Sequence, residues 1–183
     1  MRPKEHLKPL SGAPEGLESL FKRHHDMVFR TAYRTTANTV DAEDVLQTVF
    51  VRLAARKGKL DLSPDPGAYL YRAAINASLD LLRARGRLLS VPLDTVAPAA
   101  AHGPGTNPEK EQAARELQAK LRQSVSELGS RAAEIVVLKY FEGRDNAEIA
   151  KLIGTSKLVV GVTLHRARTR LRKDVRKFLE EQI

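Results

Sequence analysis

The sequence predicts an all-α protein of two small helical domains joined by a flexible linker, the second domain being a helix-turn-helix. Apolar residues recur at spacings of three and four in several segments, and no segment alternates long enough to indicate a strand. Between Leu88 and Asn107 prolines, glycines and alanines replace any periodic face. We therefore divide the 183 residues into a flexible tail (1–13), a first domain (14–87), a linker (88–108) and a second domain (109–183).

Three helices are expected in the first domain. The first begins near Leu17 and follows one helical face until Asn38 and Thr39 interrupt it. The second carries acidic residues in its first turn, where negative charge suits the helix dipole, and ends at Gly58. The third runs from about 68 to 85. It is apolar nearly all round, so we expect it to lie centrally among the others.

The second domain is expected to contain four helices. Asn107 caps the first, whose apolar stripe is Ala113, Leu117, Leu121, Val125 and Leu128, and another runs from about 131 to 141. Asp145 caps the next, with Glu148 in capping-box spacing and Gly154 at its end. Ser156 caps the last helix, whose expected buried stripe is Val160, Leu164, Ala167, Leu171, Val175 and Phe178.

Charge and composition favour a nucleic-acid partner. Lys and Arg number 31 against 22 acids, a net charge of +9, which suits polyanions. No apolar run approaches the roughly 20 residues of a membrane span, and the first residues have no apolar signal core, so a cytoplasmic protein is expected. The sequence has no cysteine, which excludes disulfides and thiolate zinc sites.

Enzymatic chemistry is not indicated. No nucleophile elbow, paired carboxylates or phosphate-binding loop is present, so we expect no catalysis, no cofactor and no small-molecule substrate. His24 and His25 beside Asp26 suggest a metal at first sight. Adjacent residues point to different faces of a helix, however, and we expect no metal site.

The stretch DNAEIAKLIGTSKLVVGVTLHRARTRLRK pairs a short capped helix with a long basic helix across a three-residue turn, which is a DNA-reading arrangement. Residues 157–183 hold eight Lys or Arg against three acids, which argues against a generic helical hairpin. The face opposite Val160 starts apolar and offers no bidentate donor for a purine. It could touch a thymine methyl, approach DNA backbone or dock a protein. Its residues are Leu158, Gly161, Val162, His165, Thr169 and Arg172.

Three segments in order, DAEDVLQTVFVRL, AYLYRAAINASLDLLRARGR and AEIAKLIGTSKLVVGVTLHRARTRLRK, resemble regions two and four of the extracytoplasmic-function (ECF) sigma factors of the sigma-70 family. The resemblance covers nearly all of residues 17–175. It implies that residues 14–87 form region two and residues 109–183 form region four. It also implies a sigma factor that binds core RNA polymerase, recognises and melts promoter DNA, and is controlled by an anti-sigma factor.

The resemblance carries three sets of site residues to this chain. The expected contacts with core polymerase are Asp41, Asp44, Gln47 and Phe50. The expected contacts with the minus-ten element are Tyr69, Arg72, Asn76, Arg83 and Arg85, beside a base-capturing loop over 60–67. The expected contacts with the minus-thirty-five element are Ser156, Lys157, His165, Arg166 and Arg168. The chain departs from the family at Gly161 and Thr163, where relatives usually place a lysine and an arginine.

Two other functions fit parts of the pattern. The apolar start of the last helix suits a sigma mimic that binds an anti-sigma partner without opening DNA. A conventional helix-turn-helix repressor that dimerises through its amino-terminal helices would instead protect a two-fold symmetric operator.

Overall fold

The computed structural model describes residues 16–55, 65–89 and 108–181, and every regular element in these ranges is helical. The all-α prediction is therefore confirmed. The predicted tail, most of the predicted linker and most of the loop before the third helix lie outside the described residues. The elements are α1 (Leu17–Thr36), α2 (Thr39–Ala55), α3 (Pro66–Leu89), α4 (Pro108–Ser126), α5 (Ser130–Val136), the π-helix η1 (Val137–Phe141), α6 (Asn146–Ile153) and α7 (Lys157–Glu180).

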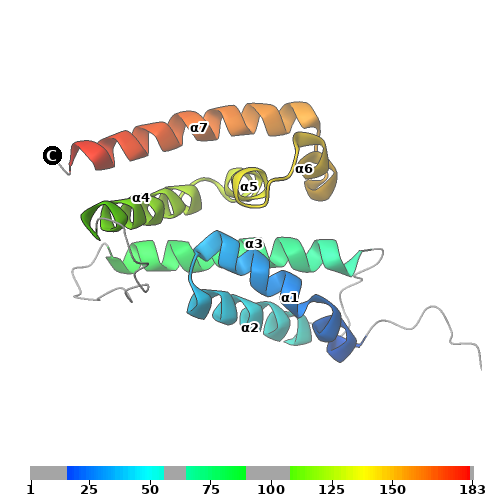
Figure 1. Cartoon of the computed structure of the whole chain (residues 1–183). Coiled ribbons are helices and arrows are strands. Elements are labelled where there is room, and N and C mark those ends of the chain that lie inside the picture. The colour runs from blue at the N-terminus through cyan, green and yellow to red at the C-terminus, as the bar shows by residue number, and fades with distance from the viewer. Residues whose placement is uncertain (1–15, 56–64, 90–107, 182–183) are drawn as a thin grey trace, which may run out of the picture.

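The helices lie in layers, with α7 on one outer side, α4 and α5 beneath it, then α3, and α1 with α2 on the opposite side (Figure 1). One buried cluster joins α1, α2 and one side of α3. A second cluster joins α4 to α7 with the other side of α3. The expectation that the third helix is central is thus confirmed, since α3 contributes to both cores.

The start of α3 lies further toward the amino terminus than the sequence pattern predicted. The helix begins at Pro66. Backbone N–H groups in the first turn of a helix have no carbonyl partner within the helix, so proline, which has no N–H, is well suited to this position. Asp65 Oδ1 accepts a hydrogen bond from Ala68 N at 2.9 Å and caps the helix. The dipeptide Asp65–Pro66 is therefore a helix start. The sequence pattern instead places it in the preceding loop.

The predicted helix over 131–141 is divided into α5 and η1. Glu142 N donates to Val137 O at 3.0 Å, a spacing of five residues that defines a π-turn. The six consecutive residues 133–138 are all buried, which shows that this segment crosses the middle of the carboxy-terminal core. Because the apolar residues of this segment do not lie on one side of a helix, their spacing could not predict the change from an α-helix to a π-helix.

The structure confirms the predicted caps and turn of the helix-turn-helix. Asp145 Oδ1 accepts from the N–H groups of Ala147 and Glu148, and the Glu148 side chain accepts from Asp145 N, which completes the predicted capping box. Gly154 adopts φ 65°, where a side chain would be strained. Ser156 accepts from Val159 N at 3.2 Å and caps α7.

The buried stripes of the long helices end earlier than predicted. Of the expected α7 stripe, the first four members are buried, whereas Val175 and Phe178 are only half-buried. On α4 the predicted stripe is buried only toward its carboxy-terminal end: Val125 is buried, as is Leu128 just after the helix, but Ala113 is exposed. Both helices therefore extend past the end of the carboxy-terminal core, and Leu121 of α4 lines a shallow groove with Val175 and Leu179 of α7.

Candidate nucleic-acid interface

The recognition helix α7 is held by its buried side and presents the opposite side to solvent. Val160 is 0% exposed and Leu164 is 2% exposed, and both pack in the carboxy-terminal cluster. On the opposite side, Leu158 is 76% and Val162 is 43% exposed. The outward face predicted from the sequence is therefore the outward face of the structure.

The residues predicted to contact the minus-thirty-five element lie on two sides of α7. Ser156, Lys157, His165 and Arg166 are exposed, and the last three line a hollow with the apolar residues of the outward face. Arg168 instead borders the groove formed with Leu121 and Tyr140. The structure thus groups most of this set but places Arg168 apart from it.

The residues predicted to contact the minus-ten element lie along α3. Tyr69, Arg72, Asn76 and Arg83 are half-buried, and Arg85 is exposed. The next tyrosine, Tyr71, is 8% exposed and packs in the core that α3 shares with the carboxy-terminal helices, so it has a structural role. Burial raises the pKa of Tyr71 to about 12, which keeps its hydroxyl neutral.

Arg72 is bound to the carboxy-terminal half of the chain. Its Nε donates to Glu134 Oε1 at 2.7 Å and its Nη2 donates to Glu134 Oε2 at 3.5 Å. The side chain of Glu134 is only 7% exposed, so this carboxylate depends on Arg72 for compensation of its charge. Arg72, which is predicted to contact the minus-ten element, is therefore already bonded to Glu134 in this structure.

Further polar contacts join the two halves of the molecule. Arg83 Nε donates to Ser126 O at 2.6 Å, and Arg122 Nε donates to Thr35 O at 3.2 Å. In addition, Arg34 Nη1 lies 2.9 Å from Glu142 Oε2. Each of these contacts crosses from the α1–α3 half to the α4–α7 half.

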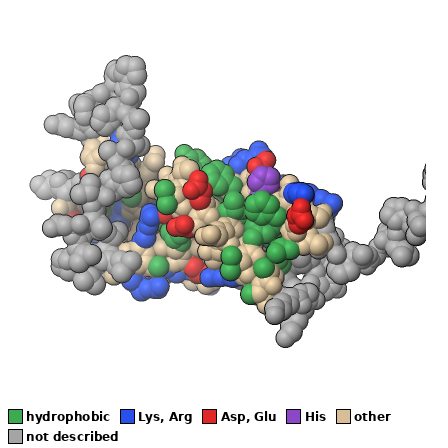
Figure 2. Space-filling view, turned by 90° about the horizontal axis from the view of Figure 1, so that it is seen from below, with side chains coloured by type: hydrophobic (Ala, Val, Ile, Leu, Met, Phe, Trp, Pro, Cys, Tyr) green, Lys and Arg blue, Asp and Glu red, His purple; other side chains and the backbone are tan. Residues whose placement is uncertain are grey.

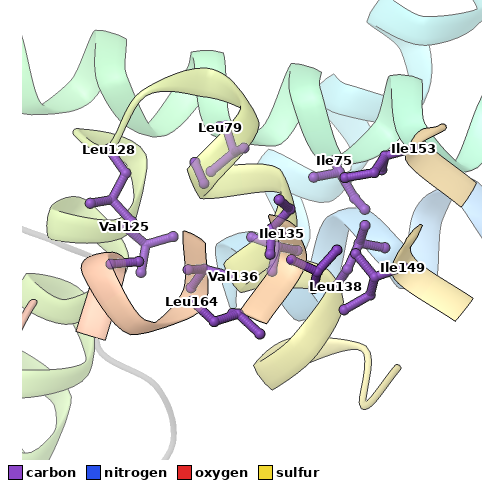
Figure 3. Packing of buried hydrophobic residues seen from close by; sticks show 14 of the residues in the cluster. Ile75, Leu79, Val125, Leu128, Ile135, Val136, Leu138, Ile149, Ile153 and Leu164 are labelled. Carbon is purple, nitrogen blue, oxygen red and sulfur yellow. The ribbon is translucent and has the colours of Figure 1, made fainter. Parts of the chain in front are cut away.

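The apolar part of the same junction is formed by α3 itself. Ile75 and Leu79 are fully buried and point into the cluster that contains Val136 and Leu138 (Figure 3). The carboxy-terminal core is therefore completed by side chains from the amino-terminal half. The two halves are packed together in this structure, an arrangement that the sequence pattern did not reveal.

The residues predicted to contact core polymerase differ in accessibility. Asp44 and Gln47 are exposed on α2, whereas Phe50 is 8% exposed and packs edge-on against Phe21 with ring centroids 4.9 Å apart. Asp41 is buried and forms an ion pair with Arg85. Asp44 and Gln47 are therefore accessible to a partner. Asp41 and Phe50 instead hold α2 in place through buried contacts.

A large part of the α1–α2 face is apolar, with hydrophobic side chains gathered between charged ones (Figure 2). Leu17, Phe21, Val40 and Val51 from these two helices are each more than two-fifths exposed. Exposed apolar residues among charges of both signs suit a protein partner. This face includes the helix that carries Asp44 and Gln47.

Burial of Asp41 has a measurable consequence for stability. Loss of solvation raises the pKa of the Asp41 carboxyl, and attraction by Arg85 only partly opposes this. Because the folded pKa is raised, the unfolded chain releases this proton first as pH rises. Ionisation of Asp41 therefore lowers the free energy of unfolding between its ordinary pKa and the raised value.

We expect Asp41→Asn to be as stable as the wild type at neutral pH, or more stable by up to about 1 kcal/mol, because the buried charge is removed. The fall in stability as pH rises above the ordinary pKa of an aspartate should become shallower. Urea unfolding across this pH range measures both effects, with Glu43→Gln, an exposed acid on α2, as the control. A loss of more than about 2 kcal/mol at neutral pH would contradict the expected cost of burying Asp41.

Within the described residues, no cluster of three or more potential metal ligands is found, and none of the helices is both long and apolar enough to cross a membrane. What the fold does contain is a capped helix-turn-helix with an exposed basic helix, packed against a second helical unit. This combination defines a DNA-binding protein with two helical cores.

Comparison with known proteins identifies the family. Residues 20–88 match the model of sigma-70 region 2, and residues 118–171 match a model of sigma-70 region 4. The RNA polymerase sigma-E factor of Streptomyces coelicolor is 31% identical over 158 residues, which cover 86% of this chain and 85% of that protein. The chain belongs to the ECF RNA polymerase sigma factors, which are transcription initiation factors and not enzymes.

Two further similar proteins are less identical to this chain. The ECF sigma factor SigW of Bacillus subtilis is 26% identical over 174 residues, covering 90% of this chain and 91% of that protein. The solved structure of the sigma factor RpoE from Bartonella quintana, in complex with the anti-sigma factor NepR, is 18% identical with a TM-score of 0.47. That alignment covers 87% of this chain and 96% of the solved chain.

Proposed function

We propose that this sigma factor binds core RNA polymerase in the cytoplasm, directs it to promoters and opens the minus-ten region, while the polymerase performs the chemistry. The observation that carries the proposal is the presence of two elements suited to DNA in one chain. They are the exposed recognition helix α7 and the α3 segment that combines Tyr69, Arg72 and Asn76. Stacking side chains and cations are what melted DNA requires.

For α3 to act in this way, the two halves of the chain must separate. Arg72 and Arg83 are both bonded to the carboxy-terminal half, and neither can contact promoter DNA while those bonds persist. We propose that the closed arrangement is the free state and that polymerase binds an open one. The exposed Asp44 and Gln47, beside the apolar residues of the α1–α2 face, provide the initial contact with polymerase.

Run-off transcription tests the proposal. The purified full-length chain is mixed with core polymerase and promoter-containing genomic fragments, and we expect discrete initiation sites that core enzyme alone does not use. The absence of initiation on all genomic fragments would contradict the proposal. A chain that co-purifies only with an anti-sigma protein would favour a sigma mimic, and a symmetric footprint without polymerase would favour a repressor.

We also propose an anti-sigma factor as the regulatory partner. Support comes from the shallow groove between α4, η1 and α7, where apolar side chains of Leu121, Tyr140 and Leu179 are accessible between arginines. Such a surface suits an amphipathic helix with acidic flanks. Co-purification from the native host, compared between the wild type and Leu179→Asp, tests whether this groove holds the partner.

A further inference from the structure

The first two turns of α7 form an apolar surface with a cationic rim. Leu158, Gly161 and Val162 line a hollow whose border includes Lys157 and Arg166. Residues at spacings of three and four share one side of a helix, so the three apolar positions form a continuous strip. The strip lies where a recognition helix presents side chains to base edges.

The strip is fixed in place by the rest of the domain. Val160 and Leu164 anchor the opposite side of the helix in the core, and Ser156 caps its first turn. The apolar residues are therefore held outward by rigid structure. A surface held rigidly in this way is suited to reading a fixed pattern of groups in the major groove.

The rim indicates nucleic acid as the occupant. Neither Lys157 nor Arg166 forms an ion pair with an acid among the described residues, and both remain exposed at the edge of the hollow. The amino-terminal end of α7 adds the positive end of its dipole on the same side. Phosphates would meet these charges while the strip faced the base edges between them.

Gly161 adds a second observation. A Cβ atom built at this glycine meets no other atom within 4 Å, so the fold does not require a glycine there. Glycine inside a helix costs stability relative to alanine. The gap that it leaves between Leu158 and Val162 gives a group on the DNA room to enter the strip.

We infer that Leu158 and Val162 recognise the C5 methyl groups of thymines in the upstream promoter element, with Gly161 admitting the base edge between them. Thymine is the only base that presents a methyl group in the major groove, and an apolar side chain is its natural contact. The inference rests on the proposed promoter-binding function. It gives the amino-terminal turns of this helix base specificity through apolar side chains.

Replacing thymine by uracil tests the inference, because it removes the methyl group and leaves base pairing intact. Holoenzyme made with the full chain is bound to an upstream element located by run-off transcription, and each thymine of that element is replaced in turn. We expect affinity to fall about threefold to tenfold at one or two positions, the effect of losing an apolar contact of that size. Other positions should not respond.

Variants assign the effect to residues. Leu158→Ala or Val162→Ala should abolish the difference between thymine and uracil at one position each. Val159→Ala is the matched control, since Val159 is 44% exposed in the same turn but does not line the hollow. Gly161→Ala should fold at least as stably as the wild type yet bind the element more weakly, because the added methyl fills the gap.

The outcomes separate this inference from the proposed function. If the wild-type holoenzyme initiates at the promoter but binds thymine and uracil elements equally, the thymine inference is wrong and the sigma-factor function stands. Loss of discrimination in Val159→Ala equal to that in Leu158→Ala would also overturn it. If no promoter supports initiation, both the proposed function and the inference fail.

Discussion

Replacing Arg72 and Asn76 together with alanine is expected to reduce promoter opening at least about thirtyfold, while the variant still binds core polymerase at least as tightly as the wild type. Hydrogen bonds to charged groups contribute about 1.5–3 kcal/mol each, and melted bases must recover a few kcal/mol of unstacking energy from their pocket. Arg72 and Asn76 are one helical turn apart on α3, so both can address the same strand. Permanganate footprinting measures opening, and competition binding measures core affinity.

A structural role of Arg72 needs a separate control, because the variant also leaves the buried carboxylate of Glu134 without its partner. Glu134→Gln removes the acidic partner of this ion pair and leaves Arg72 in place. If Arg72 serves DNA, this variant should open promoters as well as the wild type or better. Equal losses in both variants would assign Arg72 to holding the halves together, and full opening in both would refute the assignment of α3 as the melting helix.

Local signals made most of the helical elements predictable. The capping box at Asp145, the left-handed Gly154 and the cap at Ser156 depend on residues within one turn, so their chemistry is visible in the sequence. The outward face of α7 follows from helical periodicity alone. The π-turn after Val136 escaped prediction because its neighbours are apolar on all sides.

The state of the site residues was not predictable in the same way. The position of Asp41 in the first turn of a helix is typical of a solvent-exposed acid. In the structure its carboxylate is buried and pairs with Arg85, which lies 44 positions later in the sequence. Arg72 and Glu134 are 62 positions apart, and their pairing depends on how two domains dock. Periodicity shows that a helix has an apolar side but does not identify the partner that will cover it.

The docking of the two halves leads to the second large expected effect. Ile75 is 0% exposed on α3 and packs with the carboxy-terminal helices, whereas Leu70 is 0% exposed on the same helix and packs with α1 and α2. Truncating either side chain to alanine should cost about 2–5 kcal/mol. Ile75→Ala loses packing at the junction of the two halves, whereas Leu70→Ala loses packing within the amino-terminal half, so the two variants form a matched pair.

Ile75→Ala should weaken the junction and shift the free chain toward an open arrangement. We expect its radius of gyration, measured by small-angle scattering, to increase while helical content by circular dichroism is retained. Leu70→Ala should instead lower the unfolding midpoint of the amino-terminal half without expanding the native chain. An unchanged radius of gyration for Ile75→Ala would show that the polar contacts alone keep the halves together.

The same pair of variants tests whether closure limits assembly with polymerase. If only the open form binds, the apparent dissociation constant of the wild type equals the intrinsic constant divided by the fraction that is open, so it is larger than the intrinsic constant. A variant that is open more often therefore has a smaller apparent dissociation constant. Ile75→Ala should therefore bind core polymerase more tightly than the wild type in spite of its lost packing, and Leu70→Ala should not. Tighter binding by a destabilised variant is difficult to explain unless the closed junction competes with polymerase. If Ile75→Ala binds no more tightly than Leu70→Ala, closure does not control assembly.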